Sequence, residues 1–212
     1  MILDPDGFLN ITCYPDYKLN FFGIPKAGNT AIKASLLKVN IRDSSKLRHD
    51  EVYDHKKRIY ITKEHAIKLS NQNSFVNFSV IRSPYRRMMS LYHHFVIRDP
   101  SRMSELHPNL KDCNFEYFIN FLFDNTTDDT CNHHMKSLCH FLLDKNNVII
   151  PSIIFDLDDN ILKLNKFITS YGCTLQKVNA NHNYDYCLSK KLKNLIKKRY
   201  QNDFITFKFM EN

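Results

Sequence analysis

Runs of consecutive apolar residues alternate along this chain with segments whose apolar residues recur at helical spacing. The apolar runs at 18–24 and 75–81 are typical of buried strands. A polar turn at 25–30 follows the first run, and a helical pattern follows the turn. After the second run, Ser83 can cap a helix and Pro84 suits its first turn. Both segments therefore predict a strand that leads directly into a helix.

The same alternation continues over the rest of the chain. Short strands are expected at 58–62 and 148–155. Apolar residues at helical spacing predict helices in five further segments, at 64–69, 115–122, 135–142, 161–171 and 188–196. Strands that alternate with helices predict an α/β fold with a mainly parallel central sheet flanked by helices.

The composition is typical of one soluble globular domain. With 212 residues, 43% of them hydrophobic, the chain can form a single core, and no linker or repeat divides it. No stretch approaches the roughly 18 apolar residues of a membrane span, and the first residues lack the features of a signal peptide. Six scattered cysteines without a Cys-x-x-Cys pair are expected to be reduced thiols. We therefore expect one domain over residues 1–212, in a cytoplasmic protein without a membrane anchor.

The formal net charge of +8 indicates a polyanionic partner. Nucleic acid, an anionic membrane, an acidic glycan and a multiply phosphorylated nucleotide all fit this charge, which does not choose among them. Part of the charge lies on the expected helix near the C-terminus, whose polar side carries six basic residues: Lys190, Lys191, Lys193, Lys197, Lys198 and Arg199. A solvated helix face explains this cluster, and an acidic acceptor could also dock on it.

The first strand-to-helix turn has the residues of an anion site. Two of the four glycines in the chain, Gly23 and Gly28, flank Pro25 and Lys26 there. A glycine-containing turn that opens a helix directs backbone N–H groups and the positive end of the helix dipole at one point, which favours phosphate or sulfate. Lys26 adds a cation and Thr30 a hydroxyl. In the Walker motif the lysine follows the second glycine, whereas Lys26 precedes it, so an ordinary ATP or GTP hydrolase is disfavoured.

A second polar cluster follows the strand at 75–81. Arg82 comes at the end of this strand, and Ser83, Arg87 and Ser90 share one face of the expected helix. A guanidinium and a hydroxyl that converge on one point suit a terminal phosphate. The alternative is a helix cap with arginines that face solvent.

Together the two clusters resemble the sulfotransferases that use PAPS (3′-phosphoadenosine 5′-phosphosulfate), especially their carbohydrate and Golgi-type branch. In that family a Pro-Lys-x-Gly-x-Thr loop after the first strand binds the 5′-phosphosulfate. The matching residues here are Pro25, Lys26, Ala27, Gly28, Asn29 and Thr30. The resemblance also implies the P-loop NTPase-like fold of the sulfotransferases.

The second motif of the family is Arg-x-Pro-x-x-Arg-x-x-Ser-x-Tyr at the end of a later strand. It is matched here by Arg82, Pro84, Arg87, Ser90 and Tyr92. The resemblance implies that Arg82 and Ser90 hold the 3′-phosphate, the group that distinguishes PAPS from ATP. This chain departs from the family at Ser83 and Arg86, where an acidic or polar residue and a glutamate are common.

Sulfuryl transfer needs charge neutralisation at the leaving oxygen and a base for the acceptor proton. Lys26 is the candidate for neutralisation, and the reaction requires no metal ion. His65 is the first candidate for the base, because some heparan-type members of the family carry an active-site histidine in this region, and neighbouring Glu64 is its rival. His133 and His134 are further candidates that could lie on an acceptor loop.

Two other functions compete with a sulfotransferase. A nucleotide kinase of P-loop type should have a Walker lysine beside a magnesium-binding Ser or Thr, and this pattern is absent. A basic module that binds nucleic acid or glycan without catalysis should have no phosphate loop, yet Lys26 and Arg82 both follow strands, where α/β sheets bind ligands. We therefore predict a PAPS-dependent sulfotransferase that does not bind nucleic acid. Its acceptor is a hydroxyl of a glycan or small molecule, and the irregular segment 99–114 is a candidate substrate loop.

Overall fold

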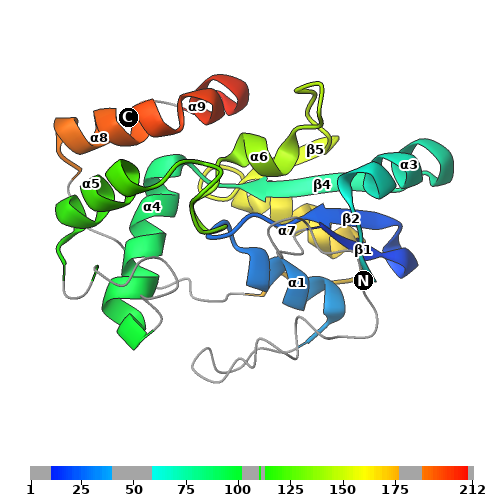
Figure 1. The fold of residues 1–212 in the computed structure, drawn as a ribbon. Coiled ribbons are helices and arrows are strands. Elements are labelled where there is room, and N and C mark those ends of the chain that lie inside the picture. Colours follow the sequence, from blue (N-terminus) through cyan, green and yellow to red (C-terminus); the bar gives the residue numbers. More distant parts are fainter. Residues whose placement is uncertain (1–10, 40–58, 102–109, 111–112, 177–187, 210–212) are drawn as a thin grey trace. The chain divides into compact units, whose positions relative to one another are not determined.

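The computed structural model describes residues 11–39, 59–101, 110, 113–176 and 188–209 (Figure 1). The chain divides into two compact units. We call the first, Met1–Ile81 with Phe141–His182, the sheet unit, and the second, Arg82–His140 with Asn183–Asn212, the helical unit. The chain passes from the helical unit back to the sheet unit within the short helix α6 (Leu138–Leu142).

The sheet has five strands in the order β3-β1-β2-β4-β5. Their bounds are β1 Ile11–Tyr14, β2 Leu19–Phe22, β3 Ile59–Tyr60, β4 Val76–Ile81 and β5 Ile153–Asp156. The pairs β2/β4 and β4/β5 are parallel, whereas β1 runs antiparallel to β2 and β3. The predicted α/β class, with a parallel sheet core and flanking helices, is confirmed. The antiparallel strand β1, joined to β2 by the short 3₁₀ helix η1 (Pro15–Tyr17), was not predicted.

One face of the sheet is apolar and packs against two helices, α1 (Asn29–Leu37) and α7 (Ile161–Ser170). Alternate strand residues point to this face, among them Phe21 and Phe78, whose rings stack at 5.0 Å. Ile32 and Leu36 of α1 and Leu164 and Ile168 of α7 complete the same buried cluster. This packing fixes the position at which α1 begins, just beyond β2.

The other face of the sheet carries a row of buried polar side chains. Asn20 donates a hydrogen bond to Asn77 at 2.8 Å, and Ser79 donates to the carbonyl of Phe22 at 2.8 Å. Helix α3 (Lys63–Asn73) lies by this row, because Asn77 also donates to the carbonyl of Ala66 at 3.4 Å. These hydrogen bonds satisfy the amide of Asn77 and the hydroxyl of Ser79, which would otherwise be costly to bury.

The helical unit contains α4 (Pro84–Tyr92), its π-helical continuation η2 (His93–Arg98), α5 (Phe115–Asn125), α8 (Lys190–Arg199) and α9 (Gln201–Phe207). Its core is formed by apolar residues from all of these helices, including Met88, Phe95, Phe118, Leu192, Ile196 and Phe204. Tyr200, which is fully buried between α8 and α9, donates a hydrogen bond to the carbonyl of Met135 at 2.6 Å. The predicted amphipathic helices 115–122 and 188–196 are thereby confirmed.

Two predicted elements begin at least three residues later than expected. The helix expected at 135–142 begins only at Leu138. The strand expected at 148–155 begins at Ile153, because Val148 and Ile149 belong to a hairpin in which Ile149 bridges Leu143. The candidate substrate loop 99–114 lies largely outside the described residues. Among the residues described, no disulfide forms and no helix is long and apolar enough to cross a membrane.

Candidate functional site

The turn after β2 holds Lys26 in an unusual backbone conformation. The N–H of Ala27 donates to the carbonyl of Ile24 at 3.2 Å, which closes a β-turn with Pro25 and Lys26 at its centre. The φ angle of Lys26 is +66°, as the second central residue of a type II turn requires. Glycine normally takes this position, and a residue with a side chain costs about 1–2 kcal/mol more. A lysine thus lies where a glycine would be more stable, as is also the case at Lys18, Lys38 and Lys208.

Helix α1 begins directly after this turn, with Gly28 as its N-cap. Gly28 has φ +76°, and an added Cβ would lie 3.6 Å from Leu157, so the dihedral angle rather than space requires glycine. No described side chain caps the helix, and its first turn contains no acidic residue. The first backbone N–H groups therefore donate no hydrogen bond to a described capping side chain, and no acidic side chain of the first turn neutralises the positive end of the helix dipole.

Exposure alternates along this predicted phosphate loop. Lys26, Gly28 and Thr30 are partly exposed, whereas Pro25, Ala27 and Asn29 are buried. The three partly exposed residues supply an amine, an open backbone and a hydroxyl on the accessible side. The three buried residues anchor the loop to the sheet unit. This arrangement suits the binding of a phosphate or sulfate group.

The second predicted motif starts from the neighbouring strand. β2 and β4 are parallel and adjacent, with Phe22 opposite Ser79, so both end at the same edge of the sheet. Arg82, which is partly exposed, follows Ile81 at the end of β4. Ser83 then caps α4 by accepting a hydrogen bond from the N–H of Arg86 at 3.3 Å. The predicted strand, cap and helix are confirmed.

On α4 the open side differs from the one predicted. Ser90 is partly exposed and Arg86 is exposed, whereas every other residue of the helix is buried. Arg86 and Ser90 are four residues apart and therefore lie on the same side of the helix. The arginine that shares the open side with Ser90 is thus Arg86 and not Arg87.

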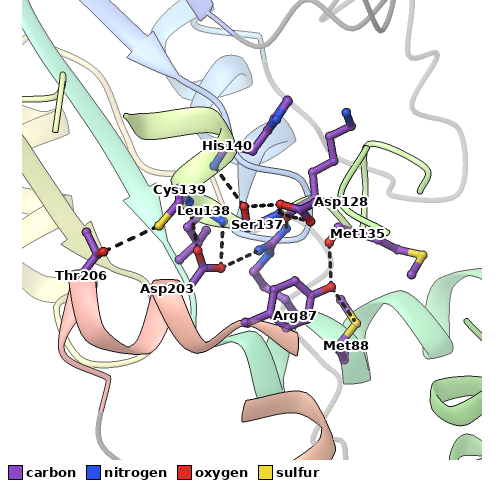
Figure 2. A network of polar contacts seen from close by, with 12 residues as sticks. Arg87, Met88, Asp128, Met135, Ser137, Leu138, Cys139, His140, Asp203 and Thr206 are labelled. Atoms are coloured by element: carbon purple, nitrogen blue, oxygen red, sulfur yellow. Dashed lines mark hydrogen bonds and ion pairs between the residues drawn. The ribbon is translucent and has the colours of Figure 1, made fainter. Parts of the chain in front are cut away.

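Arg87 is fully buried in the polar network of Figure 2. Its Nη2 donates to the carbonyl of Lys136 at 2.8 Å, and its Nη1 lies 4.0 Å from Asp203 Oδ2. Asp203 also accepts the backbone N–H groups of Leu138 and Cys139, at 2.8 and 2.9 Å. Both readings of Arg87 from the sequence, a phosphate ligand and a solvent-facing residue, were wrong. The Arg87 guanidinium makes its contacts inside the helical unit, where it stabilises the segment before α6.

Burial and ionic contacts have opposite effects on the pKa of Asp203. Desolvation raises the pKa of its carboxyl, and the charge of Arg87 and the two backbone N–H groups act in the opposite direction. Nearby, Ser137 donates to Asp128 Oδ2 at 2.6 Å and accepts the N–H of His140 at 3.1 Å (Figure 2). Together these contacts fix both ends of the segment 128–140, which carries the histidine pair.

The contacts of His134 determine the tautomer of its neutral ring. Asn132 Oδ1 accepts the backbone N–H of His134 at 3.0 Å, so this atom is the oxygen of the amide. His134 Nδ1 lies 2.7 Å from the same oxygen and must carry the proton that it accepts. Nε2 of a neutral His134 is therefore a proton acceptor. The ring packs 4.0 Å from that of His133 and 5.3 Å from that of Phe95.

His65 and Glu64 lie at the opposite end of the parallel strands from Lys26. Both are exposed on the first turn of α3. The hydrogen bond between Ala66 and Asn77, the second residue of β4, places this turn by the N-terminal part of β4. The loop that contains Lys26 instead follows the C-terminal end of β2 (Figure 1). The structure does not bring these two candidates together with Lys26.

Sequence reasoning missed two features of the helical unit. One is the pairing of Asn132 with His134, for which the only signal was an asparagine two residues before a histidine. The other is Arg86 on the open side of α4. Among the described residues, no group of three or more His, Cys, Asp and Glu side chains could hold a metal ion.

Comparison with known proteins identifies the family. The model of the sulfotransferase family matches residues 9–210. Because the match covers nearly the whole chain, the protein belongs to this family, as its two motifs predicted. No curated protein and no solved structure matches the chain significantly.

Proposed function

We propose that this chain transfers a sulfuryl group from PAPS to an acceptor hydroxyl, with a sugar hydroxyl as the acceptor. The turn before α1 is the observation that carries the proposal. It combines Lys26, Thr30 and the uncapped start of a helix, three features that favour a phosphosulfate group. Membership of the sulfotransferase family supports sulfuryl transfer in general.

Lys26 and the loop act on the donor. In the proposed step the bond between sulfur and the bridging oxygen of the 5′-phosphate breaks, and a bond between sulfur and the acceptor oxygen forms. The leaving phosphate gains negative charge, which the Lys26 amine and the N–H groups at the start of α1 neutralise. The product is PAP (adenosine 3′,5′-bisphosphate). The positively charged turn favours this transition state because its donors are already in position.

The 3′-phosphate of the donor is assigned to Arg82 and Ser90. Arg82 follows β4 and Ser90 lies on the open side of α4, where a guanidinium and a hydroxyl can both donate to phosphate oxygens. Arg86, one turn before Ser90 on the same side, adds a third donor group. Selectivity for PAPS over ATP follows from these residues, because ATP lacks the 3′-phosphate.

His134 is the better supported base for the acceptor proton. Its hydrogen bond to Asn132 leaves Nε2 as the proton acceptor of the neutral ring, and the polar network around Asp203 fixes the segment that carries it. His65 and Glu64 are exposed at the other end of the strands from Lys26. We therefore assign the base to His134 and retain His65 and Glu64 as the alternatives to be tested.

A transfer assay with two labelled donors tests the proposed function. The protein is incubated with PAPS carrying labelled sulfate, or with ATP carrying a labelled γ-phosphate, and with chondroitin, neutral oligosaccharides and a phenol as acceptors. We expect label from PAPS on an acceptor, with an equal amount of PAP released, and no label from ATP. Transfer from ATP would identify a kinase instead. If the protein shows no sulfuryl transfer and does not bind PAP, the sulfotransferase assignment is contradicted.

A further inference from the structure

Helices α8 and α9 share one outward side in the helical unit. α9 follows α8 end to end (Figure 1), and hydrogen bonds continue the helical pattern across the junction. The N–H of Tyr200 donates to the carbonyl of Ile196 at 3.0 Å, and the N–H of Phe204 donates to the carbonyl of Tyr200 at 3.1 Å. Leu192, Ile196, Tyr200 and Phe204 recur every four residues and are buried in the core of this unit. The opposite side of both helices therefore faces solvent as one continuous surface.

This outward side combines cations with one large apolar side chain. Its exposed residues, which we call the outer face, are Lys190, Lys191, Asn194, Lys198, Gln201, Asn202, Ile205 and Lys208. Most of them recur at steps of three or four residues, so they form a row along the helix pair. From Lys191 to Lys208 the row extends about 26 Å. Ile205, which is 67% exposed, lies in the row between Lys198 and Lys208, and no residue of the outer face is acidic.

Contacts with α5 and the turn after it hold α8 in place. Arg199, which lies outside the outer face, donates from Nη1 to the carbonyl of Thr126 at 2.6 Å, and its guanidinium lies 5.5 Å from the centre of the Phe123 ring. At the other end of α8, Lys191 pairs with Glu116 at 3.4 Å. The outer face is therefore presented on a helix that is anchored at both ends.

The stability of the helices does not explain the outer face. Lys190 and Lys191 lie in the first turn of α8, where the helix dipole disfavours cations and no acidic residue is present. The exposed pair with Glu116 offsets little of this cost. Ile205 gains no hydrophobic stabilisation while most of its side chain stays in water. Both features become favourable against a surface that is anionic outside and apolar beneath.

We infer that the outer face docks on an anionic lipid membrane. Each lysine near such a surface strengthens binding roughly fivefold, and the long lysine stems keep the amines at the level of the head groups. Ile205 then inserts at the boundary between head groups and acyl chains, as apolar residues of interfacial helices do. A soluble polyanion would leave Ile205 in water. The outer face has none of the arginines and aromatic rings by which proteins bind single-stranded nucleic acids. Membrane docking goes beyond the transfer reaction and does not depend on it.

Two variants, each with a matched control, test the charged and the apolar part of the outer face. The lysine variant carries Lys190→Gln, Lys198→Gln and Lys208→Gln. Its control loses the same charge from exposed lysines of α3 and α7, as Lys68→Gln, Lys163→Gln and Lys166→Gln. The apolar variant is Ile205→Ser, and its control is Leu162→Ser on α7, where the leucine is 75% exposed.

Binding is measured by co-sedimentation with two kinds of vesicle. One kind is phosphatidylcholine alone, and the other contains phosphatidylcholine and phosphatidylserine at a ratio of about three to one. The affinities of the same proteins for a single-stranded DNA oligonucleotide and a heparin oligosaccharide are measured in solution. These soluble polyanions separate attraction to charge from insertion into a bilayer.

We expect the wild type to bind the anionic vesicles at least about tenfold more tightly than the neutral ones, and the lysine variant to lose at least about tenfold of its affinity for the anionic vesicles. Ile205→Ser should weaken vesicle binding by about three- to tenfold, because it removes an apolar side chain from the bilayer. The same variant should change the affinities for DNA and heparin by less than about twofold, since these bind through charge. Both controls should change vesicle binding by less than about twofold.

Three results would overturn membrane docking. Equal vesicle affinities of the lysine variant and its control would show that net charge alone attracts the protein to vesicles. Wild-type vesicle binding by Ile205→Ser, with the lysine variant weakened toward vesicles, DNA and heparin alike, would show a surface for soluble polyanions instead. Equal binding of the wild type to anionic and neutral vesicles would show that the lysines do not recognise lipid charge.

Discussion

Arg87 and Asp203 form an ion pair at 4.0 Å in the helical unit, and neither side chain is exposed to solvent. The pair links α4 to α9, and each partner also binds the backbone of the segment before or within α6. Removing both charges from water is costly, and the pair is stabilising only while every partner is present. The segment that carries His133 and His134 therefore depends on a contact between two helices far apart in sequence.

Loss of one partner should destabilise the protein strongly. Arg87→Met should lower the free energy of unfolding by about 3–5 kcal/mol, because it leaves the Asp203 charge buried without its counterion. The exposed neighbour provides the control, since Arg86→Met should change stability by less than about 0.5 kcal/mol. Urea unfolding at neutral pH measures both. Similar small losses in the two variants would show that the buried pair contributes little.

The backbone strain at Lys26 predicts a trade between stability and activity. Lys26→Ala and Lys26→Gly both remove the amine and should both lower turnover by about 10²–10³. Glycine accepts φ +66° freely and alanine does not, so the glycine variant should be more stable than the alanine variant by about 1 kcal/mol. Thermal unfolding and acceptor-dependent PAP release check the two effects separately. An alanine variant as stable as the glycine variant would show that the positive φ angle at position 26 does not destabilise the protein.

The candidates for the base should differ in their effect on turnover. His134→Ala should lower acceptor-dependent PAP release by about 10²–10⁴ while PAP binding is retained, because a base acts on the acceptor and not on the donor. Asn132→Ala should lower turnover less, since it removes only the hydrogen bond that fixes the tautomer of His134. His65→Ala and Glu64→Gln should stay near the wild type. If either of these abolishes turnover and His134→Ala does not, the base lies on α3.

Asp156 should make stability depend on pH. Burial raises the pKa of its carboxyl above the ordinary value near 4, although hydrogen bonds from the backbone at Asp158 oppose this. The folded protein then binds the proton more tightly than the unfolded chain, so the contribution of this group falls as pH rises above about 4. Asp156→Asn keeps the acceptor for the Asp158 N–H and cannot ionise. Urea unfolding between pH 4 and 7 should show the variant gaining stability relative to the wild type as pH rises; a constant difference would contradict the shift.

Local signals were sufficient to predict the two strand-to-helix connections that carry the proposed donor-binding residues. Glycine, proline and a serine cap act within a few residues, so β2, the turn with Lys26, and the start of α4 could all be predicted from the chain. β1 could not, because a four-residue strand followed by Pro15 has a weak local signal and its antiparallel partner is set by long-range pairing.

The main feature that could not be predicted from the sequence is which side of helix α4 is buried. Helical spacing places Arg87 near Ser90 but does not show that Arg87 faces the core, because its partner, Asp203, lies far along the chain. A charged side chain is rarely assigned to a core without knowledge of its counterion. The tautomer of His134 likewise depends on a contact with Asn132 that no periodicity reveals.

We propose that the protein recognises its donor through the 3′-phosphate. PAP and AMP differ only in this group, and calorimetry measures the affinity of the wild type and of Arg82→Ala for each. We predict that the wild type binds PAP tighter than AMP by about 1.5–3 kcal/mol, the range for hydrogen bonds to charged groups, or roughly 10- to 150-fold. Arg82→Ala should lose most of this preference and keep its affinity for AMP. Equal affinity of the wild type for PAP and AMP would show that the 3′-phosphate is not recognised.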